Sequence, residues 1–431
     1  MCYRTVGNTI MNKHDQRKEE IITAAFIEWG KTKFRNTSLS SLAREVGMTK
    51  PALYRYFSKK DDILKSMKIR FSSAYGRIVR EFMDLSSGQG IQEIVHSFNK
   101  SHTEFFLENP EYYLFLFFYI MKEPVESTPL FYDILAKQTK FLGDYFPEPA
   151  VSIPYFINTL VFFLSRILCF DDTNLALIRE DNKGIIDDID SIFLNGFLNS
   201  EKLSNIDFNS IEKICLVDNK PRELREPIGS SKKKALPVDR IFTAITDVVA
   251  RDGIWEASIE KIARRAGMSK SSLYFHFNGK EDMLSQMIER EYKVLFKLFM
   301  AEEENIHSFT EYVFSFLVIT VSHLLNNPTV LSVLNWFRIQ RGEIKHHPPK
   351  NDFLINKFFF IKEAFDSGKL ISNNLDLYEI IIYLNFQVIR ETMDSYKKKR
   401  SVEEALKRIR VIYKLFMNGI LRLGDDNEQD D

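Results

Sequence analysis

A long internal repeat constrains the fold of this sequence more than any other feature. The stretch GMTKPALYRYFSKKDDIL, which begins at Gly47, returns with changes as GMSKSSLYFHFNGKEDML from Gly267. Residues 21–67 align with residues 241–287 without a gap, at an offset of 220. Similarity at a fixed and long period indicates a structural unit that is present twice.

Two shorter markers extend the repeat well beyond this segment. The tripeptide ENP, which ends at Pro110, returns as NNP ending at Pro328, at an offset of 218. The segment IFLNGFL from Ile192 returns as LFMNGIL from Leu415, at an offset of 223. The offsets are nearly constant, so the duplicated unit comprises about half of the 431 residues.

The apolar residues of both halves follow a helical rhythm. Ile22, Ala25, Phe26 and Trp29 recur at the spacing of one helix face, and strand-like alternation is nearly absent. We therefore predict an all-α fold. The helices are expected at 14–30, 38–46, 49–56, 60–84, 90–107, 110–122, 128–145, 151–170 and 184–198, and at 238–252, 258–265, 269–276, 280–301, 307–326, 328–340, 351–367, 375–397 and 402–422.

A change in composition separates the two halves. Residues 200–237 hold three prolines, a Gly-Ser-Ser sequence and alternating charges, which are typical of a connector. We expect one short ordered piece within it, near Ile211–Val217. The predicted domains are a first head (12–60), a first body (61–200), a linker (201–237), a second head (238–280) and a second body (281–424).

The net charge of zero conceals a segregation of charge along the chain. Residues 1–70 carry a net charge of +8 and residues 230–280 one of +5, whereas residues 71–200 carry −9. Both basic peaks coincide with the repeated motif. A basic surface at each copy would favour an anionic partner such as nucleic acid, although a single charge run is often only a solvated face.

The remaining composition argues against several other classes of protein. Cys2, Cys169 and Cys215 lack the spacing of a disulfide framework or a zinc site. The eight histidines form no HExxH pattern, and no Gly-rich phosphate loop is present. We therefore predict no enzymatic activity, no catalytic residues, no metal and no cofactor.

No segment is expected to enter a membrane. The N-terminus lacks the apolar core of a signal peptide. The apolar runs 112–121 and 161–170 fall short of the roughly 20 residues that a spanning helix needs, and Arg166 interrupts the second. These runs are interpreted as core helices, and a cytoplasmic location is expected.

The repeated motif has the residues of a helix-turn-helix. Ser38 is suited to cap a short helix, and Ala43 is small enough for two helices to cross closely. Gly47 suits the left-handed turn that follows, Thr49 can cap the second helix, and Leu53 would fix it to the core. The same roles fall in the second half on Ser258, Ala263, Gly267, Ser269 and Leu273.

With these residues in place, both heads resemble the DNA-binding head of the TetR family of transcriptional regulators. The order Ala-Arg, Gly-Met-Thr/Ser-Lys, Leu-Tyr and Phe-x-x-Lys is shared by both copies. The resemblance implies that the second helix of the motif enters the DNA major groove. It also implies that the helical body binds a small molecule and dimerises. Family members are usually half this length, so the chain departs from them by joining two unlike units.

The resemblance also names the residues expected to contact DNA. The first turn of the recognition helix would reach bases, and the tyrosine hydroxyls and the following lysine would reach phosphates. The alternatives are an aromatic packing rim for the tyrosines and solvated surface for the lysines. The expected residues are Ser38, Thr49, Lys50, Pro51, Ala52, Tyr54, Arg55, Tyr56 and Lys60 in the first head, and Ser258, Ser269, Lys270, Ser271, Ser272, Tyr274, His276 and Lys280 in the second.

The last two helices of each half correspond to the dimer-forming pair of the family. We expect 151–170 and 184–198 to pack against 375–397 and 402–422 as a four-helix bundle within one chain. The many aromatic residues of the first body either line an apolar pocket for a small effector or form an ordinary packed core. The polar candidates on apolar helices are ligand handles or satisfied buried groups. The named pocket residues are Phe118, Arg166, Gln387 and Arg390.

Two functions follow from these observations. The first is a sequence-specific regulator of the TetR type, by family expectation a repressor. Its two recognition helices differ, because Arg55 of the first head corresponds to Phe275 of the second, so it would read an asymmetric site on double-stranded DNA. The chain would act as a monomeric pseudo-dimer, with a higher oligomer left open. The alternative is a ligand-sensing or protein-interaction protein in which only the first head still binds DNA.

Overall fold

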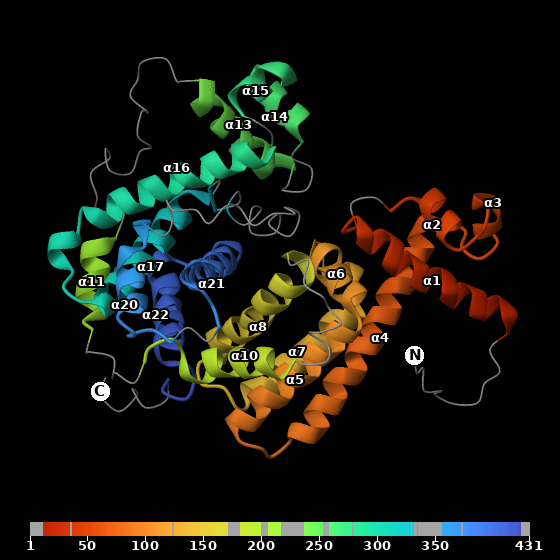
Figure 1. The fold of residues 1–431 in the computed structure, drawn as a ribbon, viewed down its shortest axis with the longest axis horizontal. Helices are drawn as coiled ribbons and strands as arrows, with labels where there is room; N and C mark the ends of the chain where they lie inside the picture. Colours follow the sequence, from red (N-terminus) through yellow and green to blue (C-terminus); the bar gives the residue numbers. More distant parts are fainter. Residues whose placement is uncertain are drawn as a thin grey trace. The chain divides into compact units, whose positions relative to one another are not determined.

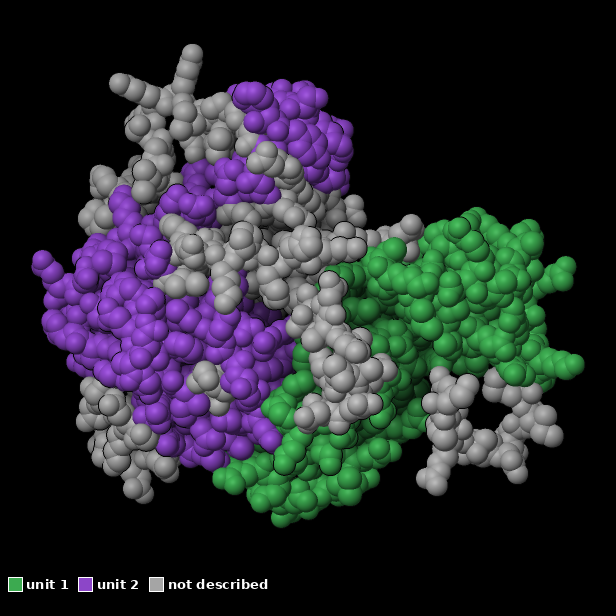
Figure 2. Space-filling model, in the orientation of Figure 1, with its two compact units in different colours: residues 1–145, 167–186 green, residues 146–166, 187–431 purple. Residues whose placement is uncertain are grey.

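The computed structural model describes residues 12–34, 37–122, 125–170, 182–199, 206–216, 237–252, 258–277, 280–328, 330, 331, 334, 356–371 and 374–423. Within these residues the regular elements are helices, with one isolated β-bridge between Leu198 and Leu370 (Figure 1). The prediction of a tandem all-α architecture is confirmed. The chain divides into two compact units, residues 1–145 with 167–186 and residues 146–166 with 187–431 (Figure 2).

Unit 1 contains the first head and most of the first body, and its helices begin and end close to the predicted positions. The predicted helix 110–122 is shorter than expected, because it ends at Phe118 and continues as a 3₁₀ turn. The helices of unit 1 are α1 (Lys13–Lys31), α2 (Leu39–Glu45), α3 (Lys50–Leu53), α4 (Lys60–Ser86), α5 (Ile91–Glu108), α6 (Pro110–Phe118) and α7 (Pro129–Gly143).

The core of the first body combines stacked aromatic rings with one buried hydrogen-bond chain. The Tyr75 hydroxyl donates to Oε1 of Gln138 at 3.0 Å, and the Gln138 amide nitrogen lies 2.8 Å from Nε2 of His102. His102 Nδ1 lies 2.8 Å from the carbonyl oxygen of Phe98, which can only accept, so Nδ1 carries the proton. Burial lowers the pKa of His102 to about 4, so the ring is neutral and the chain is satisfied from end to end.

Unit 2 contains the second head, the second body and the last helices of the first half. The predicted helix 328–340 lies mostly outside the described residues, and the predicted helix 351–367 is described only from residue 356. Its helices are α8 (Pro149–Ser165), α10 (Lys183–Asn195, from residue 187 onward), α11 (Phe208–Cys215), α13 (Pro237–Asp252), α14 (Ile259–Arg265), α15 (Lys270–His276), α16 (Lys280–Met300), α17 (Phe309–Asn326), α20 (Phe359–Asp366), α21 (Leu377–Lys397) and α22 (Val402–Asn418).

The predicted packing between the ends of the two halves is present within unit 2. Helices α8, α21 and α22 pack against one another, and Phe193 of α10 packs against Phe156 of α8 with ring centroids 4.4 Å apart. Thr159 of α8 and Tyr383 of α21 share a buried hydrogen bond of 2.8 Å. This packing explains why the compact units do not follow the predicted domain boundaries, since α8 belongs with the second half.

The two Asn-Gly markers of the sequence meet in this bundle. The backbone N–H of Phe197 donates to the carbonyl of Phe416, and the N–H of Ile420 donates to the carbonyl of Phe193, both at 2.9 Å. Residues 197 and 420 stand at the same place in the two halves, as do 193 and 416. The two hydrogen bonds are therefore equivalent under the repeat. In each half, the residue that follows Asn-Gly donates to a carbonyl of the helix that precedes Asn-Gly in the other half.

Part of the predicted linker is docked rather than free. The expected ordered piece near Ile211–Val217 is present as α11, which packs on α17 and α22. The Phe208 ring lies 4.8 Å from the ring of Phe314, and the Arg410 guanidinium donates to the Glu212 carboxylate at 2.6 Å. The expectation of one short ordered piece in the connector is therefore confirmed, and α11 buries the side chains of Ile211 and Cys215.

Among the described residues, two helices are long and apolar enough to span a membrane. They are the continuous helix Pro149–Cys169, in which α8 runs on into a π-helical turn, and α17. The expectation that the run around Arg166 is too short is thus wrong for the helix that contains it. In both, most of the apolar window is buried inside the structure, 67% and 72%, which is the behaviour of core helices.

Candidate nucleic-acid interface

The first head folds as the spacing of its caps predicts. The Ser38 hydroxyl accepts the backbone N–H of Ser41, and the Thr49 hydroxyl accepts that of Ala52, each at 3.3 Å. Gly47 turns the chain at a φ of +65°, in the left-handed region that favours glycine. Leu53 is buried, so the recognition helix is fixed to the core by the predicted residue. Ser38 and Thr49 are thereby occupied at least partly as caps.

The recognition helix of the first head is short and offers two cations. Helix α3 comprises only residues 50–53 rather than the predicted 49–56, and turns continue it to Tyr56. Lys50 and Arg55 are exposed, and no carboxylate of the described residues pairs with either. Tyr54 is 45% exposed beside them. Pro51 and Ala52 fill the first turn, exposed and half-buried respectively.

Two other expected contact residues of the first head have partners within the protein. The Tyr56 ring stacks on the ring of His14, with centroids 5.0 Å apart. The Lys60 ammonium, at the start of α4, donates to the Thr37 hydroxyl at 3.1 Å and remains exposed. Tyr56 therefore serves at least partly as the aromatic rim that was the alternative reading, whereas Lys60 stays accessible to an anion.

The second head repeats the framework of the first. The Ser258 hydroxyl accepts the backbone N–H of Lys261 at 3.3 Å, and the Ser269 hydroxyl accepts that of Ser272 at 3.0 Å. Gly267 has a φ of +66°. Ser271 and Ser272 are exposed on the first turn of α15. The side chains of His276 and Lys280 lie outside the described residues.

The charges of the second recognition helix are arranged differently. The Lys270 ammonium lies 2.5 Å from Oε1 of Glu260 on α14, and 6.0 Å from the centroid of the Tyr274 ring. The hydrogen bond from Lys270 lowers the pKa of Glu260 to about 2, so both partners are charged at neutral pH. Phe275 takes the place of Arg55 and is 87% exposed. Glu260 was missed in the sequence, although the alignment places it opposite Ser40.

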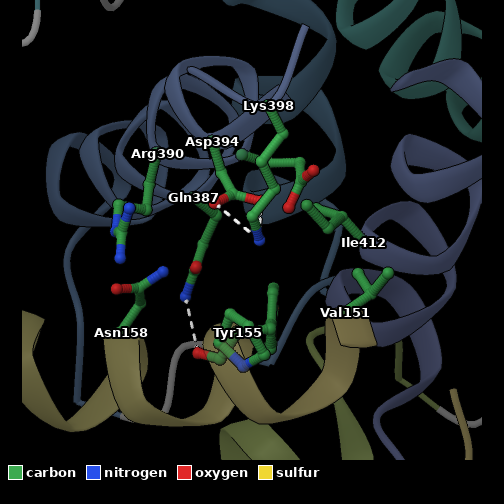
Figure 3. Close-up of a pocket in the computed structure, with 10 residues that line it drawn as sticks. Val151, Tyr155, Asn158, Gln387, Arg390, Asp394, Lys398 and Ile412 are labelled. Carbon is green, nitrogen blue, oxygen red and sulfur yellow. Dashed lines mark hydrogen bonds and ion pairs between the residues drawn. The ribbon is translucent and has the colours of Figure 1, made fainter. Parts of the chain in front are cut away.

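Three of the four predicted effector residues belong to unit 2, and Phe118 belongs to unit 1. Phe118 is buried in unit 1, and Arg166 forms an ion pair with Glu379 at 2.8 Å. Gln387 and Arg390 of α21 do line a common cavity of about 60 Å³ in unit 2, which Asn158 of α8 closes from below (Figure 3). Asp394, paired with Lys398 at 3.1 Å, completes its polar wall. Its polar side chains share the lining with the apolar Val151, Pro154 and Ile412.

Known proteins match both heads. The family model described as "Bacterial regulatory proteins, tetR family" matches residues 21–67 and again residues 241–287. Both heads belong to the TetR family. The two matched ranges are the repeat found in the sequence, and each contains one complete helix-turn-helix. The chain is thus a tandem arrangement of TetR-family heads, as predicted.

The chain spans well under half the length of the curated relatives that it matches. The regulator SrpR from Pseudomonas putida is 37% identical over 49 residues, which are 11% of this chain and 23% of that protein. The uncharacterized regulator TtgW, also from Pseudomonas putida, is 37% identical over 49 residues and is covered to 37%. The fatty acid degradation regulator FadR from Bacillus halodurans is 18% identical, with 43% of this chain and 97% of that structure covered at a TM-score of 0.30.

The described residues also bear on other chemistry. Within them no group of three or more His, Cys, Asp or Glu side chains could hold a metal ion. Burial raises the pKa of the Cys169 thiol to about 12, which leaves it without the thiolate character of a nucleophile.

Proposed function

We propose that this protein is a sequence-specific DNA-binding transcriptional regulator of the TetR type. The observation that carries the proposal is the pair of helix-turn-helix heads with a lysine and a tyrosine at matching places of each recognition helix. Lys50 with Tyr54, and Lys270 with Tyr274, are exposed on both. Exposed cations beside an aromatic hydroxyl suit phosphates flanking a groove, and the first turn of the helix would then face base edges.

We further propose that the two heads read different halves of an asymmetric site. Pro51 and Ala52 of the first head correspond to the hydroxyl-bearing Ser271 and Ser272 of the second. Arg55, a donor to guanine or phosphate, corresponds to Phe275, which can offer only apolar contact such as that with a thymine methyl group. The bundle already joins the ends of both halves inside one chain, which supports a chain acting as a monomeric pseudo-dimer. By family expectation the regulator represses.

Separate substitutions in the two heads test this function. We expect the double variant Lys50→Ala/Tyr54→Ala to weaken binding of a mixed-sequence duplex about tenfold to a hundredfold, because two backbone contacts are lost. Lys270→Ala/Tyr274→Ala should weaken it less. Fluorescence anisotropy at several salt concentrations measures both affinity and its salt dependence, and circular dichroism confirms that the variants fold. Wild-type binding that is absent, or that is insensitive to salt, would contradict the proposal.

A second candidate has one observation in its favour. The ion pair between Lys270 and Glu260 leaves the second head with less free positive charge, as expected for a head that has lost DNA binding. In that case only the first double variant would change affinity, and the bound site would contain a single half-site. Selection of bound sequences from a random duplex pool therefore separates the two candidates.

A small effector is proposed for the cavity of unit 2 rather than for the aromatic core. Arg390 and Asn158 both line it (Figure 3), and the Gln387 amide nitrogen donates to the Tyr155 carbonyl and to the Thr159 hydroxyl, both at 3.3 Å. The lining carboxylates of Glu391 and Asp394 are paired with Arg408 and Lys398 respectively. The Arg390 guanidinium in this cavity of about 60 Å³ therefore suits a small carboxylate. An apolar effector would leave the Arg390 guanidinium without a charged partner.

The effector proposal predicts a selective stabilisation. Acetate should raise the thermal unfolding midpoint relative to chloride at equal ionic strength, and Arg390→Gln should abolish the difference. Lys407→Gln is the matched control, because that lysine is on α22 and its side chain is 67% exposed. An acetate effect of equal size in wild type and Arg390→Gln would show that the anion does not bind at this cavity.

A further inference from the structure

The two heads hold the lysine that opens the recognition helix in different electrostatic surroundings. Lys270 is the first residue of α15, and its ammonium reaches back to Glu260, the second residue of α14. Both side chains are about half exposed, 52% and 55%, so the pair lies on the surface rather than in the core of the head. An exposed ion pair of this kind contributes little to the stability of the fold. Its main effect is on the affinity of the lysine for another anion.

In the part of the first head that the structure describes, no carboxylate pairs with the corresponding Lys50. The residue that corresponds to Glu260 is Ser40, which is exposed and uncharged, and the first turn of α2 contains no acidic residue. The acidic residue that ends α2, Glu45, pairs instead with Lys31 at 3.4 Å. Since the two frameworks share their caps, turn glycine and buried leucine, the difference between Ser40 and Glu260 is a difference in charge on the same scaffold.

This difference has a direct consequence for binding to a polyanion. Much of the affinity for DNA comes from cations that displace condensed counterions from phosphates. A lysine that is already paired with a carboxylate must first break that ion pair. The carboxylate then remains close to the phosphate that the lysine approaches. The exposed Phe275, in place of Arg55, removes a second cation from the same helix.

We propose that Glu260 weakens DNA binding by the second head because it pairs with Lys270, so that the first head supplies most of the affinity for DNA. The proposal rests on the proposed function, because it concerns a site for DNA on the second head. Glu260 then determines the difference in DNA affinity between the two heads. The second head then contributes through base contacts of Ser271, Ser272 and Phe275 more than through charge.

The repeat provides a reciprocal test on the full chain. Glu260→Ser gives the second head the residue of the first, and Ser40→Glu does the reverse. Affinity for a mixed-sequence duplex of about 30 base pairs is measured by anisotropy at several salt concentrations. We expect Glu260→Ser to tighten binding several-fold and to steepen the plot of log affinity against log salt by about one, the contribution of one phosphate contact. Ser40→Glu should weaken binding and flatten the plot.

A control separates this effect from a general change in net charge. Glu403 lies on the exposed surface of α22, paired with Lys407, and Glu403→Ser changes the charge of the chain by the same amount. It should leave affinity within a factor of two of wild type. Glu260→Gln, which keeps the size of the side chain, guards against a local effect of shortening it.

The outcomes distinguish this inference from the proposed function. If the wild-type chain binds no duplex, the proposed function fails. If it binds and Lys50→Ala/Tyr54→Ala weakens binding, but Glu260→Ser equals Glu403→Ser in affinity and salt dependence, the function stands and the role of Glu260 is refuted. Weaker binding by Glu260→Ser also refutes it, since Glu260 would then be holding Lys270 in the position that DNA requires.

Discussion

Replacing Gly419 with alanine is expected to unfold unit 2 at temperatures at which the wild-type chain remains folded. Gly419 has a φ of +69°, and a Cβ added there would lie closer than 3.0 Å to the carbonyl carbon and oxygen of Leu194. These are backbone atoms of the other half, so no side-chain rotation relieves the clash. The paired segments would have to separate, and with them the hydrogen bonds from Phe197 to Phe416 and from Ile420 to Phe193.

Another glycine of unit 2 is a control for the cost of a positive φ without a backbone clash. Gly368 is also in unit 2 and has a φ of +73°, but no atom lies within 4 Å of a Cβ built on it. Gly368→Ala should cost about 1 kcal/mol, the usual penalty of a left-handed alanine. Gly419→Ala should cost more than about 3 kcal/mol, because a backbone clash is added and because the ψ of −176° lies in a region that glycine almost alone adopts. Circular dichroism during heating measures both, and equal unfolding midpoints for the two variants would refute the explanation.

The same comparison of glycine variants can be extended to DNA binding. Gly196, the counterpart of Gly419, has a φ of +72°, and a Cβ added there would lie 2.5 Å from the carbonyl oxygen of Met417. Gly196→Ala should therefore resemble Gly419→Ala in stability. If the bundle holds two heads for one DNA site, both variants should also lose DNA affinity at temperatures below their unfolding midpoints, whereas Gly368→Ala should not.

These glycines show what the sequence could predict and why. The Asn-Gly markers were visible as a repeat, and so was the pairing of the helices that contain them, because both follow from residue identity and spacing. The reason for the glycines was not visible, since it lies in two backbones that meet 223 residues apart. The caps at Ser38, Thr49 and Ser269 were predictable for the opposite reason, because a cap depends on neighbours within one turn of helix.

In the candidate site, too, the local features were predictable and the contacts between distant residues were not. The framework of each head and its exposed lysine follow from local pattern. The pairing of Lys270 with Glu260 depends on two helices and on one residue that differs between copies. Similarly, Gln387 and Arg390 were recognisable as polar residues on an apolar helix, but Asn158 was not connected to them. Only the packing of α8 against α21 brings an amide from the first half to a guanidinium of the second.

Replacing Arg408 with methionine is the other change for which a large loss of stability is expected. Arg408 of α22 donates to both oxygens of Glu391 of α21, with distances of 2.5 Å and 3.0 Å, and to the carbonyl of Ala150 in α8 at 2.7 Å. The two side chains are 13% and 6% exposed. A single guanidinium thus links three helices of the bundle, two from the second half and one from the first.

The loss should come mostly from the charge that is left behind. Removing one partner of a buried ion pair typically costs about 3–5 kcal/mol, because the other charge remains desolvated. Arg400, whose guanidinium lies 3.5 Å from the Glu391 carboxylate, can compensate in part, so the lower end of that range is expected. Lys407→Met, one residue away in an exposed pair, should change the stability by less than about 0.5 kcal/mol.

A double variant separates the ion pair from the packing around it. In Glu391→Leu/Arg408→Met no unpaired charge remains, while Arg400 keeps its partner Asp394 at 2.8 Å. We expect the double variant to be more stable than Arg408→Met alone, because apolar residues of similar size can replace a buried pair at little cost. If the double variant is no more stable than the single one, the link from Arg408 to the Ala150 carbonyl, rather than the ion pair, holds α8 to the second half.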